Sequence, residues 1–380
     1  MKLKGAIIGI SGYGNVHYTD LIQYCKDGRI EFVGATVINR EQEQEKCALL
    51  ESMGCKIYDD YKVMLKDLSG KIDFCSIPTG ILHHKDMTIE ALRRKINVLV
   101  EKPAAPDMES VQAMQLAEKE ANCFAAVGFQ YNYQESTARV KEAILSGKIG
   151  RILHLKGLCL WPRNSSYYAR NNWSGKMTFN GLTVNDAPFS NATAHYLMLL
   201  LFFAGMTMDT GAEPVRVTGR LFRANPGIES CDAAELHYIL EDGTPLDYSC
   251  SHSCRMEKGP ILKVIGEKGE IVWTPKMAEI RTANGTEVIT VATEQTVIRG
   301  SMWEAFFDKL SGGKRFITTL ELAGLHSKAV DLAFRDIPVQ TVENVEIITG
   351  ADNSFRYVIP GFEQVLLEQF DAPVDGAAIL

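Results

Sequence analysis

The glycine-rich segment Gly9-Ile10-Ser11-Gly12-Tyr13-Gly14 has residue types and spacing suited to chemistry. It comes at the end of the first apolar strand and precedes a helix-compatible stretch. Such a turn lets backbone N–H groups and a helix N-terminus approach a pyrophosphate. Gly9 and Gly14 fit the first and third positions of G-x-G-x-x-G, whereas Ser11 stands at the second and Gly12 is displaced by one residue. We predict a dinucleotide-binding turn; the alternative is a glycine-rich turn without a ligand.

The end of the second predicted strand bears on the choice between NAD and NADP. An NAD site usually carries an acid there, which holds the ribose hydroxyls. This strand ends in Ile38-Asn39-Arg40, and the first acid is Glu41. Because a guanidinium pairs well with phosphate, Asn39 and Arg40 slightly favour NADP as the cofactor. The alternative is that Arg40 only opens the next helix in solvent.

The tripeptide Glu101-Lys102-Pro103 follows another apolar run. At this distance from an N-terminal dinucleotide turn, it resembles the glucose–fructose oxidoreductase / inositol dehydrogenase / MocA (Gfo/Idh/MocA) family. Three other segments also resemble the family, namely Pro78–His83, Gly147–Gly150 and Gly266–Glu270. The resemblance covers roughly residues 5 to 340, and the E-K-P tripeptide is its most specific element.

The resemblance implies a Rossmann domain, an open-faced sheet, and hydride transfer between a nicotinamide and a hydroxyl carbon, commonly of a sugar or cyclitol. The family's catalytic lysine corresponds to Lys102, and its histidine corresponds to His195. The family commonly has an acid four residues before that histidine, where this sequence has Asn191. Asp186 lies nine residues before His195 and does not match that position.

An amide cannot accept a proton as an ionising base, although it can orient a hydroxyl by hydrogen bonds. We therefore predict Lys102 and His195 as the acid/base pair, with Asn191 as a positioning residue. The alternatives are a solvated lysine before a proline and a hydrogen-bonded histidine on an apolar helix. The predicted cofactor contacts are Gly9, Ser11, Gly12, Tyr13, Gly14, Asn15, Asn39, Arg40, Pro78, Thr79, His83, Glu101, Lys102 and Gln130.

An irregular segment from Trp161 to Lys176 concentrates aromatic and basic residues. Rings offer flat apolar faces, and basic or amide groups donate directed hydrogen bonds to a polyhydroxylated or acidic ligand. The alternative is a loop that packs aromatics over the sheet edge, and Arg170 could equally contact the cofactor or a second subunit. The predicted substrate contacts are Tyr131, Arg163, Tyr168, Trp173 and Lys176.

A metal site is not predicted. His83 and His84 are adjacent at the start of a helix, so they do not face one centre. No third ligand lies nearby in the sequence, as a zinc site would require.

Strand-length apolar runs alternate with helical spacing over about the first 130 residues. The runs are Ala6–Ile10, Ile30–Ile38, Ile72–Ile77, Asn97–Val100 and Cys123–Phe129, with a further short strand at Lys56–Tyr58. Continuous apolar strands that alternate with helices are typical of a parallel sheet covered on both faces. We predict an α/β chain in which residues 1–130 form a doubly wound, NAD(P)-binding Rossmann domain.

Beyond about Thr137, strand candidates follow one another with hairpin turns between them. A strongly apolar helix is expected from about Pro188 to Ala204, and an irregular tail after about residue 335. We predict that residues 131–380 form an α+β substrate-binding and oligomerisation domain with a large, mostly antiparallel, open-faced sheet. Alternating apolar residues such as Leu246, Tyr248 and Cys250 predict an exposed sheet face that forms a homo-oligomer interface.

Composition excludes several classes of partner. A net charge of −7 without a basic run argues against nucleic acid. The apolar run from Tyr196 to Met206 is well short of the roughly 20 residues that span a membrane, and the N-terminus does not match a signal peptide. Nine scattered cysteines without C-x-x-C spacing indicate free thiols and a cytoplasmic location.

The leading hypothesis is an NAD(P)-dependent oxidoreductase that acts on a sugar, a cyclitol or a sugar derivative. Two alternatives stay open. One is an NAD-retaining glycosidase or lyase that uses transient oxidation. The other is a non-catalytic cofactor-binding protein, which only the replacement at Asn191 supports.

Overall fold

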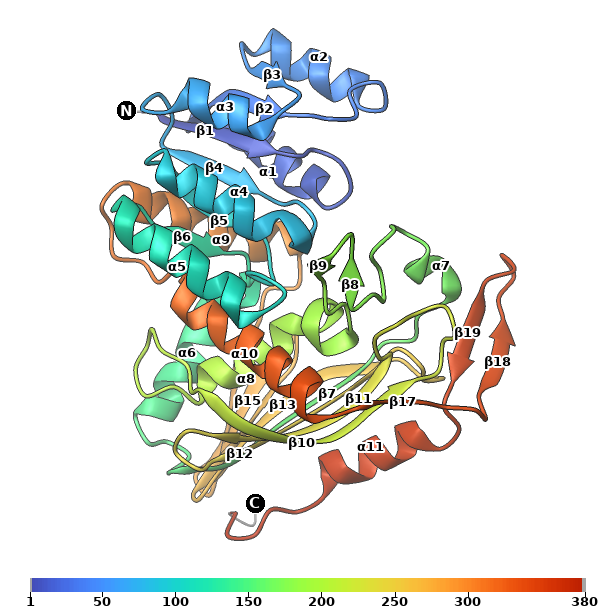
Figure 1. Cartoon of the computed structure of the whole chain (residues 1–380). Coiled ribbons are helices and arrows are strands. Elements are labelled where there is room, and N and C mark those ends of the chain that lie inside the picture. Colours follow the sequence, from blue (N-terminus) through green and yellow to red (C-terminus); the bar gives the residue numbers. More distant parts are fainter. Residues whose placement is uncertain (1, 378–380) are drawn as a thin grey trace. The chain divides into compact units, whose positions relative to one another are not determined.

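The computed structural model describes residues 2–377 (Figure 1). The chain divides into two compact units. The first comprises the residues up to Phe129 together with Arg299–Gly324, and the second comprises Gln130–Ile298 together with the residues from Leu325 onward. The predicted boundary assigns everything after residue 130 to the second domain, whereas the segment Arg299–Gly324 clusters with the first.

The first unit contains a six-stranded parallel sheet in the order β3-β2-β1-β4-β5-β6. Its strands are β1 (Leu3–Ile8), β2 (Ile30–Thr36), β3 (Lys56–Tyr58), β4 (Phe74–Ile77), β5 (Asn97–Val100) and β6 (Ala125–Val127). The connecting helices are α1 (Gly14–Lys26), α2 (Gln44–Ser52), α3 (Tyr61–Leu68), α4 (Ile81–Arg93) and α5 (Met108–Ala121). The strand order reverses between β1 and β4, so the predicted doubly wound fold is confirmed. Ligands bind such sheets at this reversal, beyond the carboxyl ends of the strands.

Helix α9 (Gln295–Leu310) completes the core of the first unit from far along the sequence. Its residues Trp303, Phe306 and Phe307 contact the ring of Phe74 on β4, with centroid separations of 6.4, 5.5 and 5.7 Å. Phe74 is fully buried. Because aromatic rings carry large buried areas, this contact explains why residues so distant in sequence belong to one unit.

The second unit is built on a nine-stranded sheet in the order β16-β15-β14-β13-β7-β12-β11-β10-β17. Only the pairs β12·β7 and β10·β17 are parallel in the described residues, which agrees with the predicted mostly antiparallel sheet. Its strands are β7 (Ile152–Leu160), β10 (Pro214–Arg223), β11 (Ala233–Leu240), β12 (Pro245–Ser251), β13 (Lys258–Gly266), β14 (Gly269–Trp273), β15 (Met277–Thr282), β16 (Gly285–Thr290) and β17 (Val339–Thr341). The other elements with residues in this unit are α6 (Glu135–Leu145), α7 (Ser165–Tyr168), β8 (Thr178–Phe179), β9 (Leu182–Thr183), α8 (Ala194–Phe203), α10 (Leu320–Asp336), the hairpin β18 (Glu346–Thr349) and β19 (Phe355–Val358), and α11 (Phe362–Asp371).

One face of this sheet packs against α8 and is apolar. The hydroxyl of Tyr248 donates to the Thr193 carbonyl at 2.9 Å. A Cβ at Gly157 would lie 2.8 Å from Leu200 on α8, so the strand and the helix touch. Leu246, Tyr248 and Cys250 are all fully buried. The prediction that these three residues form an exposed interface is therefore wrong, because their alternation points them at α8 rather than at solvent.

Helix α11 covers part of the opposite face, as Figure 1 shows in red. Phe362, Leu366 and Phe370 pack on Leu158 and Leu160 of β7 in one buried cluster. The expected irregular tail is therefore wrong. The apolar residues of this segment recur every four positions and form a helical stripe. The helix is stable only because this stripe packs against the sheet.

Two sheet lysines bind the carboxyl end of α11. The ammonium group of Lys156 donates to the carbonyls of Gln369 at 3.0 Å and Ala372 at 2.7 Å. Lys263 pairs with Asp371 at 3.0 Å. Cations stabilise a helix C-terminus because they satisfy its last carbonyls and face the negative end of its dipole.

A line of charged side chains, here called the charged strip, continues along the sheet face that α11 partly covers. Asp247 contacts the ring nitrogens of His154 and His237 at 2.8 Å each. Glu235 contacts His237 at 3.2 Å and Arg220 at 2.5 Å. Hydrogen bonds that the His237 ring donates, first to Asp247 and then to Glu235, raise the pKa of His237 to about 9.

Two predictions, on membrane-spanning helices and on free thiols, can be compared with the described residues. None of the helices described within residues 2–377 has the length and apolar character needed to cross a membrane. The nine cysteines are all free, and each is buried or half-buried.

Candidate active site

The glycine turn joins β1 to α1 and is lined by backbone. Gly9 and Gly12 have positive φ angles of 87° and 56°, which favour glycine. A Cβ at Gly14 would lie 2.6 Å from the Gly9 carbonyl oxygen, so the helix can begin this close to the strand only with glycine there. The turn thus presents backbone and the N-terminus of a 13-residue helix at the strand reversal, which is an arrangement suited to a pyrophosphate.

Side chains from two neighbouring strand ends meet this turn. The amide of Asn39, beyond β2, donates to the Ser11 hydroxyl at 2.9 Å. Pro78 and Thr79, beyond β4, lie 3.6 and 3.5 Å from the positions a Cβ would take at Gly14 and Gly9. The structure therefore brings these predicted cofactor residues together around the turn.

Two other predicted cofactor residues point elsewhere. The guanidinium of Arg40 pairs with Asp59 at 2.8 Å and donates to the Ile57 carbonyl at 3.0 Å. His83 is exposed on the surface of α4. Its neighbour His84 is buried instead, with ring nitrogens 2.9 Å from the Pro103 carbonyl and 3.0 Å from the Thr79 carbonyl. Burial lowers the pKa of His84, and its two contacts tie the loop after Lys102 to the loop after β4.

Glu101 fixes the backbone at Lys102. One carboxylate oxygen of Glu101 lies 2.9 Å from Nε2 of His17, and the other accepts the Lys102 N–H at 3.0 Å. Because a carboxylate only accepts hydrogen bonds, Nε2 of His17 carries a proton, and Nδ1 lies 2.8 Å from the Ser76 hydroxyl. This buried chain sets the position from which the Lys102 side chain extends at the carboxyl end of β5.

The sequence analysis did not identify His17 or Gly128 as part of this arrangement. A Cβ at Gly128 would lie 2.6 Å from the Glu101 carboxylate, so glycine makes room for it. The signal that sequence analysis could have used is His17 itself, a histidine in the first turn of α1 on the side that faces the strands. The predicted Gln130 belongs to the second unit, where its amide donates to Gln295 at 2.9 Å.

In the second unit, aromatic rings surround His195 at the start of α8. The Tyr131 ring lies edge-on to His195 at a centroid separation of 5.3 Å. Tyr131 and Tyr196 both contact the buried Trp273, and Tyr196 also contacts Trp161 at 5.7 Å. These rings give His195 a largely apolar wall on which a sugar ring could pack.

Asn191 lies on a single π-helical turn, Pro188–Ala192, that precedes α8. The helix expected from about Pro188 to Ala204 thus begins with this wider turn, and its α-helical part is Ala194–Phe203. Such turns are frequent at functional sites. The amide nitrogen of Asn191 donates to the buried carboxylate of Asp186 at 2.7 Å. Asp186 does not stand at the family's acid position, but its carboxylate holds Asn191, the residue that does.

The predicted substrate residues of the Trp161–Lys176 segment differ in their surroundings. The Tyr168 hydroxyl lies 3.1 Å from Nδ1 of the buried His252, and Lys176 pairs with Glu229 at 2.9 Å. The ring of Trp173 lies 5.8 Å from the guanidinium of Arg170. Arg163 stacks near Trp161 at 5.4 Å.

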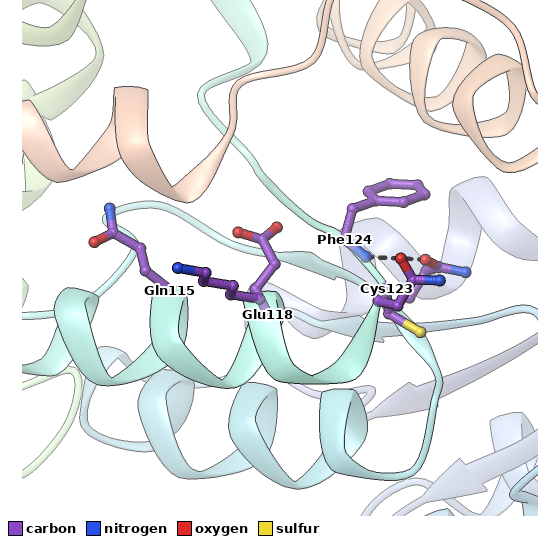
Figure 2. A pocket seen from close by; sticks show the side chains of 7 residues that line it. Gln115, Glu118, Cys123 and Phe124 are labelled. Carbon is purple, nitrogen blue, oxygen red and sulfur yellow. Dashed lines mark hydrogen bonds between the residues drawn. The ribbon is translucent and has the colours of Figure 1, made fainter.

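A hollow of about 480 Å³ lies elsewhere in the first unit, at the end of α5 (Figure 2). In it, the Phe124 N–H donates to the Asn97 side chain at 3.1 Å, and Glu118 accepts the Ala125 N–H at 2.8 Å. The hollow lies at the amino ends of β5 and β6, whereas ligands of doubly wound sheets bind at the carboxyl ends. It is therefore not assigned to the cofactor. Its lining residues are Asn97, Gln115, Glu118, Lys119, Asn122, Cys123 and Phe124.

The described part of the chain was searched for side chains that could form a metal centre. No group of three or more His, Cys, Asp or Glu side chains there is placed to hold a metal ion.

Curated proteins similar to this chain are sugar and cyclitol dehydrogenases by name. Glucose-6-phosphate 3-dehydrogenase of Bacillus subtilis is 27% identical over 157 residues, which are 40% of this chain and 41% of that protein. Inositol 2-dehydrogenase of Rubrobacter xylanophilus is 25% identical over 165 residues, which are 43% of this chain and 45% of that protein. The chain thus matches less than half the length of these curated relatives.

Solved structures share the fold. The WlbA dehydrogenase from Bordetella pertussis, in complex with NADH and UDP-GlcNAcA, has a TM-score of 0.69 at 21% identity, and the match covers 88% of this chain and 97% of that one. At this identity the likeness shows the fold alone.

Two family models match consecutive parts of the sequence. The model described as the oxidoreductase family with an NAD-binding Rossmann fold matches residues 3–129. The model of the GFO/IDH/MocA C-terminal domain matches residues 137–272. Together these matches cover well over half of the chain and confirm the resemblance inferred from the E-K-P tripeptide, so the protein belongs to the glucose–fructose oxidoreductase / inositol dehydrogenase / MocA family.

Proposed function

We propose that this chain is an NAD(P)-dependent oxidoreductase that transfers hydride between nicotinamide and a hydroxyl or keto carbon of a sugar, cyclitol or sugar derivative. The observation that carries the proposal is the fixed backbone of Lys102, held through Glu101 and His17 at the carboxyl end of β5. This end of the sheet also carries the glycine turn. The names of the curated relatives support a sugar or cyclitol as the substrate class.

The glycine turn fits a dinucleotide because it presents backbone atoms to the ligand. The strand and the helix lie so close together at the turn that a Cβ at Gly14 would not fit. The residues that would hold the cofactor are Gly9, Ser11, Gly12 and Gly14 of the turn, with Asn39 near the ribose. When bound, the nicotinamide ring accepts or supplies the hydride.

Lys102 and His195 are the groups proposed to move the hydroxyl proton. Oxidation of a secondary alcohol requires a base that takes this proton, and carbonyl reduction requires an acid that returns it. Asn191 orients the reacting hydroxyl. Its amide nitrogen donates to Asp186, and an amide oxygen is a group that can accept a hydrogen bond from a substrate hydroxyl.

For the cofactor, we propose that NAD is preferred over NADP, which reverses the slight preference inferred from Asn39 and Arg40. The supporting observation is the ion pair between Arg40 and Asp59 at 2.8 Å. A 2′-phosphate beside Arg40 would face the Asp59 carboxylate, and like charges repel. Titration with NAD and NADP tests this preference, and tighter binding of NADP would contradict it.

The experiment for the whole proposal combines cofactor titration with a turnover screen against sugars and cyclitols. Replacement Lys102→Met is expected to lower kcat by about 10²- to 10⁴-fold, the usual contribution of a general acid or base, while NAD binding is retained. Lys119→Met, an exposed lysine on α5, is the matched control and should keep full turnover.

Two outcomes would contradict the proposal. The first is that neither NAD nor NADP binds. The second is that Lys102→Met turns over substrate as fast as the unmodified protein. A cofactor that stays bound through gel filtration, without net nicotinamide turnover, would instead favour the glycosidase or lyase hypothesis.

A further inference from the structure

Two arginines lie beside one aromatic ring in the Trp161–Lys176 segment. The guanidinium carbon of Arg170 is 3.8 Å from the centroid of the Tyr167 ring, and that of Arg163 is 5.3 Å away. A guanidinium stacked on a ring keeps its N–H groups in a plane, where they can bind a carboxylate or phosphate through two parallel hydrogen bonds. Both arginines are thus positioned for anion recognition by the rings that they contact.

The charge of this pair is only partly balanced. Arg170 has Asp186 as a carboxylate neighbour at 3.7 Å. Arg163 has no carboxylate within 4.0 Å among residues 2–377, and its Nη1 donates to the Pro162 carbonyl at 3.2 Å. Lys176, the other cation predicted to contact substrate, is paired with Glu229 at 2.9 Å. Net positive charge therefore remains at Arg163 and not at Lys176.

His252 supplies a second, independent observation. It is 3% exposed, its ring lies 5.3 Å from the Tyr167 ring, and the Arg163 N–H donates to its carbonyl. Its Nε2 has no hydrogen-bond partner in the described part of the chain. Buried polar atoms are normally partnered, so an unpartnered one next to stacked arginines indicates a place where a ligand group completes the hydrogen bonding.

The same residues connect to the proposed site within the second unit. Trp161, which Arg163 contacts, touches Tyr196 beside His195. Asp186, which Arg170 contacts, holds Asn191. A ligand group bound by the arginines would therefore belong to the molecule whose hydroxyl is handled by His195 and Asn191.

We propose that Arg163 and Arg170 form an anion subsite, and that the substrate of this chain is a sugar or cyclitol that carries a carboxylate or phosphate group. The substrate class rests on the proposed function. The anion subsite itself is a binding property and can be measured without turnover.

Calorimetric titration of the protein, carried out with and without NADH, tests the subsite. The probes are D-glucuronate, D-glucose 6-phosphate and, as the neutral reference, D-glucose. At least one anionic probe should bind about tenfold or more tightly than D-glucose, because a paired charge-assisted hydrogen bond contributes about 1.5–3 kcal/mol. Comparison of the two anionic probes distinguishes a carboxylate from a phosphate substrate.

Matched variants separate the subsite from general surface charge. Arg163→Gln should weaken the preferred anionic probe about tenfold or more and leave D-glucose binding unchanged. Lys268→Gln removes the same charge from an exposed lysine in the turn between β13 and β14, and it should change neither. Thermal melting checks that both variants are folded.

Several outcomes would overturn the subsite. They are equal binding of D-glucose and both anionic probes, equal weakening by Arg163→Gln and Lys268→Gln, and no binding of any probe. Failure of the proposed function gives a different result, because anionic probes would still bind through Arg163 while no hydride transfer is detected.

Discussion

The glycine turn of the first unit and the Trp161–Asn191 segment of the second unit are built by different means. The turn is shaped by backbone, with glycines required at Gly9 and Gly14. The segment is shaped by side chains, since Asp186 accepts hydrogen bonds from the Gly175 N–H and the Asn191 amide at 2.7 Å each. A backbone site is visible in the sequence as a motif, whereas a side-chain site depends on pairs that no local pattern reveals.

Of the substitutions that compare these two regions, the one that breaks the backbone-built region should have the largest effect. Gly14→Ala places a Cβ 2.6 Å from the Gly9 carbonyl oxygen. Overpacking of this kind costs about 1–3 kcal/mol, which corresponds to roughly five- to 140-fold weaker NAD binding. Fluorescence titration with NADH measures the change.

Gly300→Ala is the control for that substitution. Gly300 lies in α9 with no atom within 4 Å of an added Cβ. This change should stabilise the helix by about 0.5–1 kcal/mol and leave NADH binding intact. Unchanged NADH binding by Gly14→Ala would mean that the turn does not hold the cofactor.

Breaking the side-chain-built region should have a smaller effect that is confined to kcat. Asp186→Asn removes the carboxylate that orients Asn191, and loss of a charge-assisted hydrogen bond costs about 1.5–3 kcal/mol. Steady-state kinetics should show a kcat reduced about tenfold or more, with NAD binding unchanged.

The double variant Asp186→Asn/Asn191→Asp sharpens this test. It restores one amide–carboxylate hydrogen bond with donor and acceptor exchanged, so it should recover part of the lost kcat. If Asp186→Asn lowers only the melting temperature and not kcat, Asp186 supports the fold and does not position Asn191.

The smallest effect is expected at the charged strip, which is also built from side chains but away from His195. The pKa of His237 is raised to about 9 from its ordinary value of 6.5, so the folded state holds this proton more tightly than the unfolded state. The stability it contributes is complete below pH 6.5 and is lost as the pH rises through 9. His237→Gln should therefore flatten the decline of the melting temperature over this range and leave kcat unchanged. An identical decline in both proteins would count against this linkage.

Much of the first unit could be predicted because its signals are local. The strands Lys56–Tyr58 and Asn97–Val100 have the predicted bounds, since short apolar runs between polar helices are recognisable without tertiary information. The helix α11 and the return of Arg299–Gly324 to the first unit could not be predicted in this way. Each is determined by a partner surface distant in sequence, namely the β7 face and the Phe74 ring.

The site shows the same division. Glycine spacing indicated the turn from residue type alone, and the family resemblance that rests on the E-K-P tripeptide indicated Lys102. Asp186 was set aside because its spacing from His195 did not fit, and its contact with Asn191 depends on the π-helical turn at Pro188–Ala192. An extra residue in a helical turn changes which side chains contact one another, and such a turn cannot be recognised from the spacing of apolar residues in the sequence.

The packing of α9 on Phe74 has a consequence for the order in which the protein can be made. The ribosome completes all six strands of the first sheet by Val127, but the residues that cover Phe74 begin at Trp303. At typical synthesis rates this leaves an unfinished core for on the order of ten to forty seconds. During that interval the nascent chain carries exposed aromatic surface. A fragment that stops near residue 130 would keep that surface permanently and should need a chaperone or a detergent to remain dispersed.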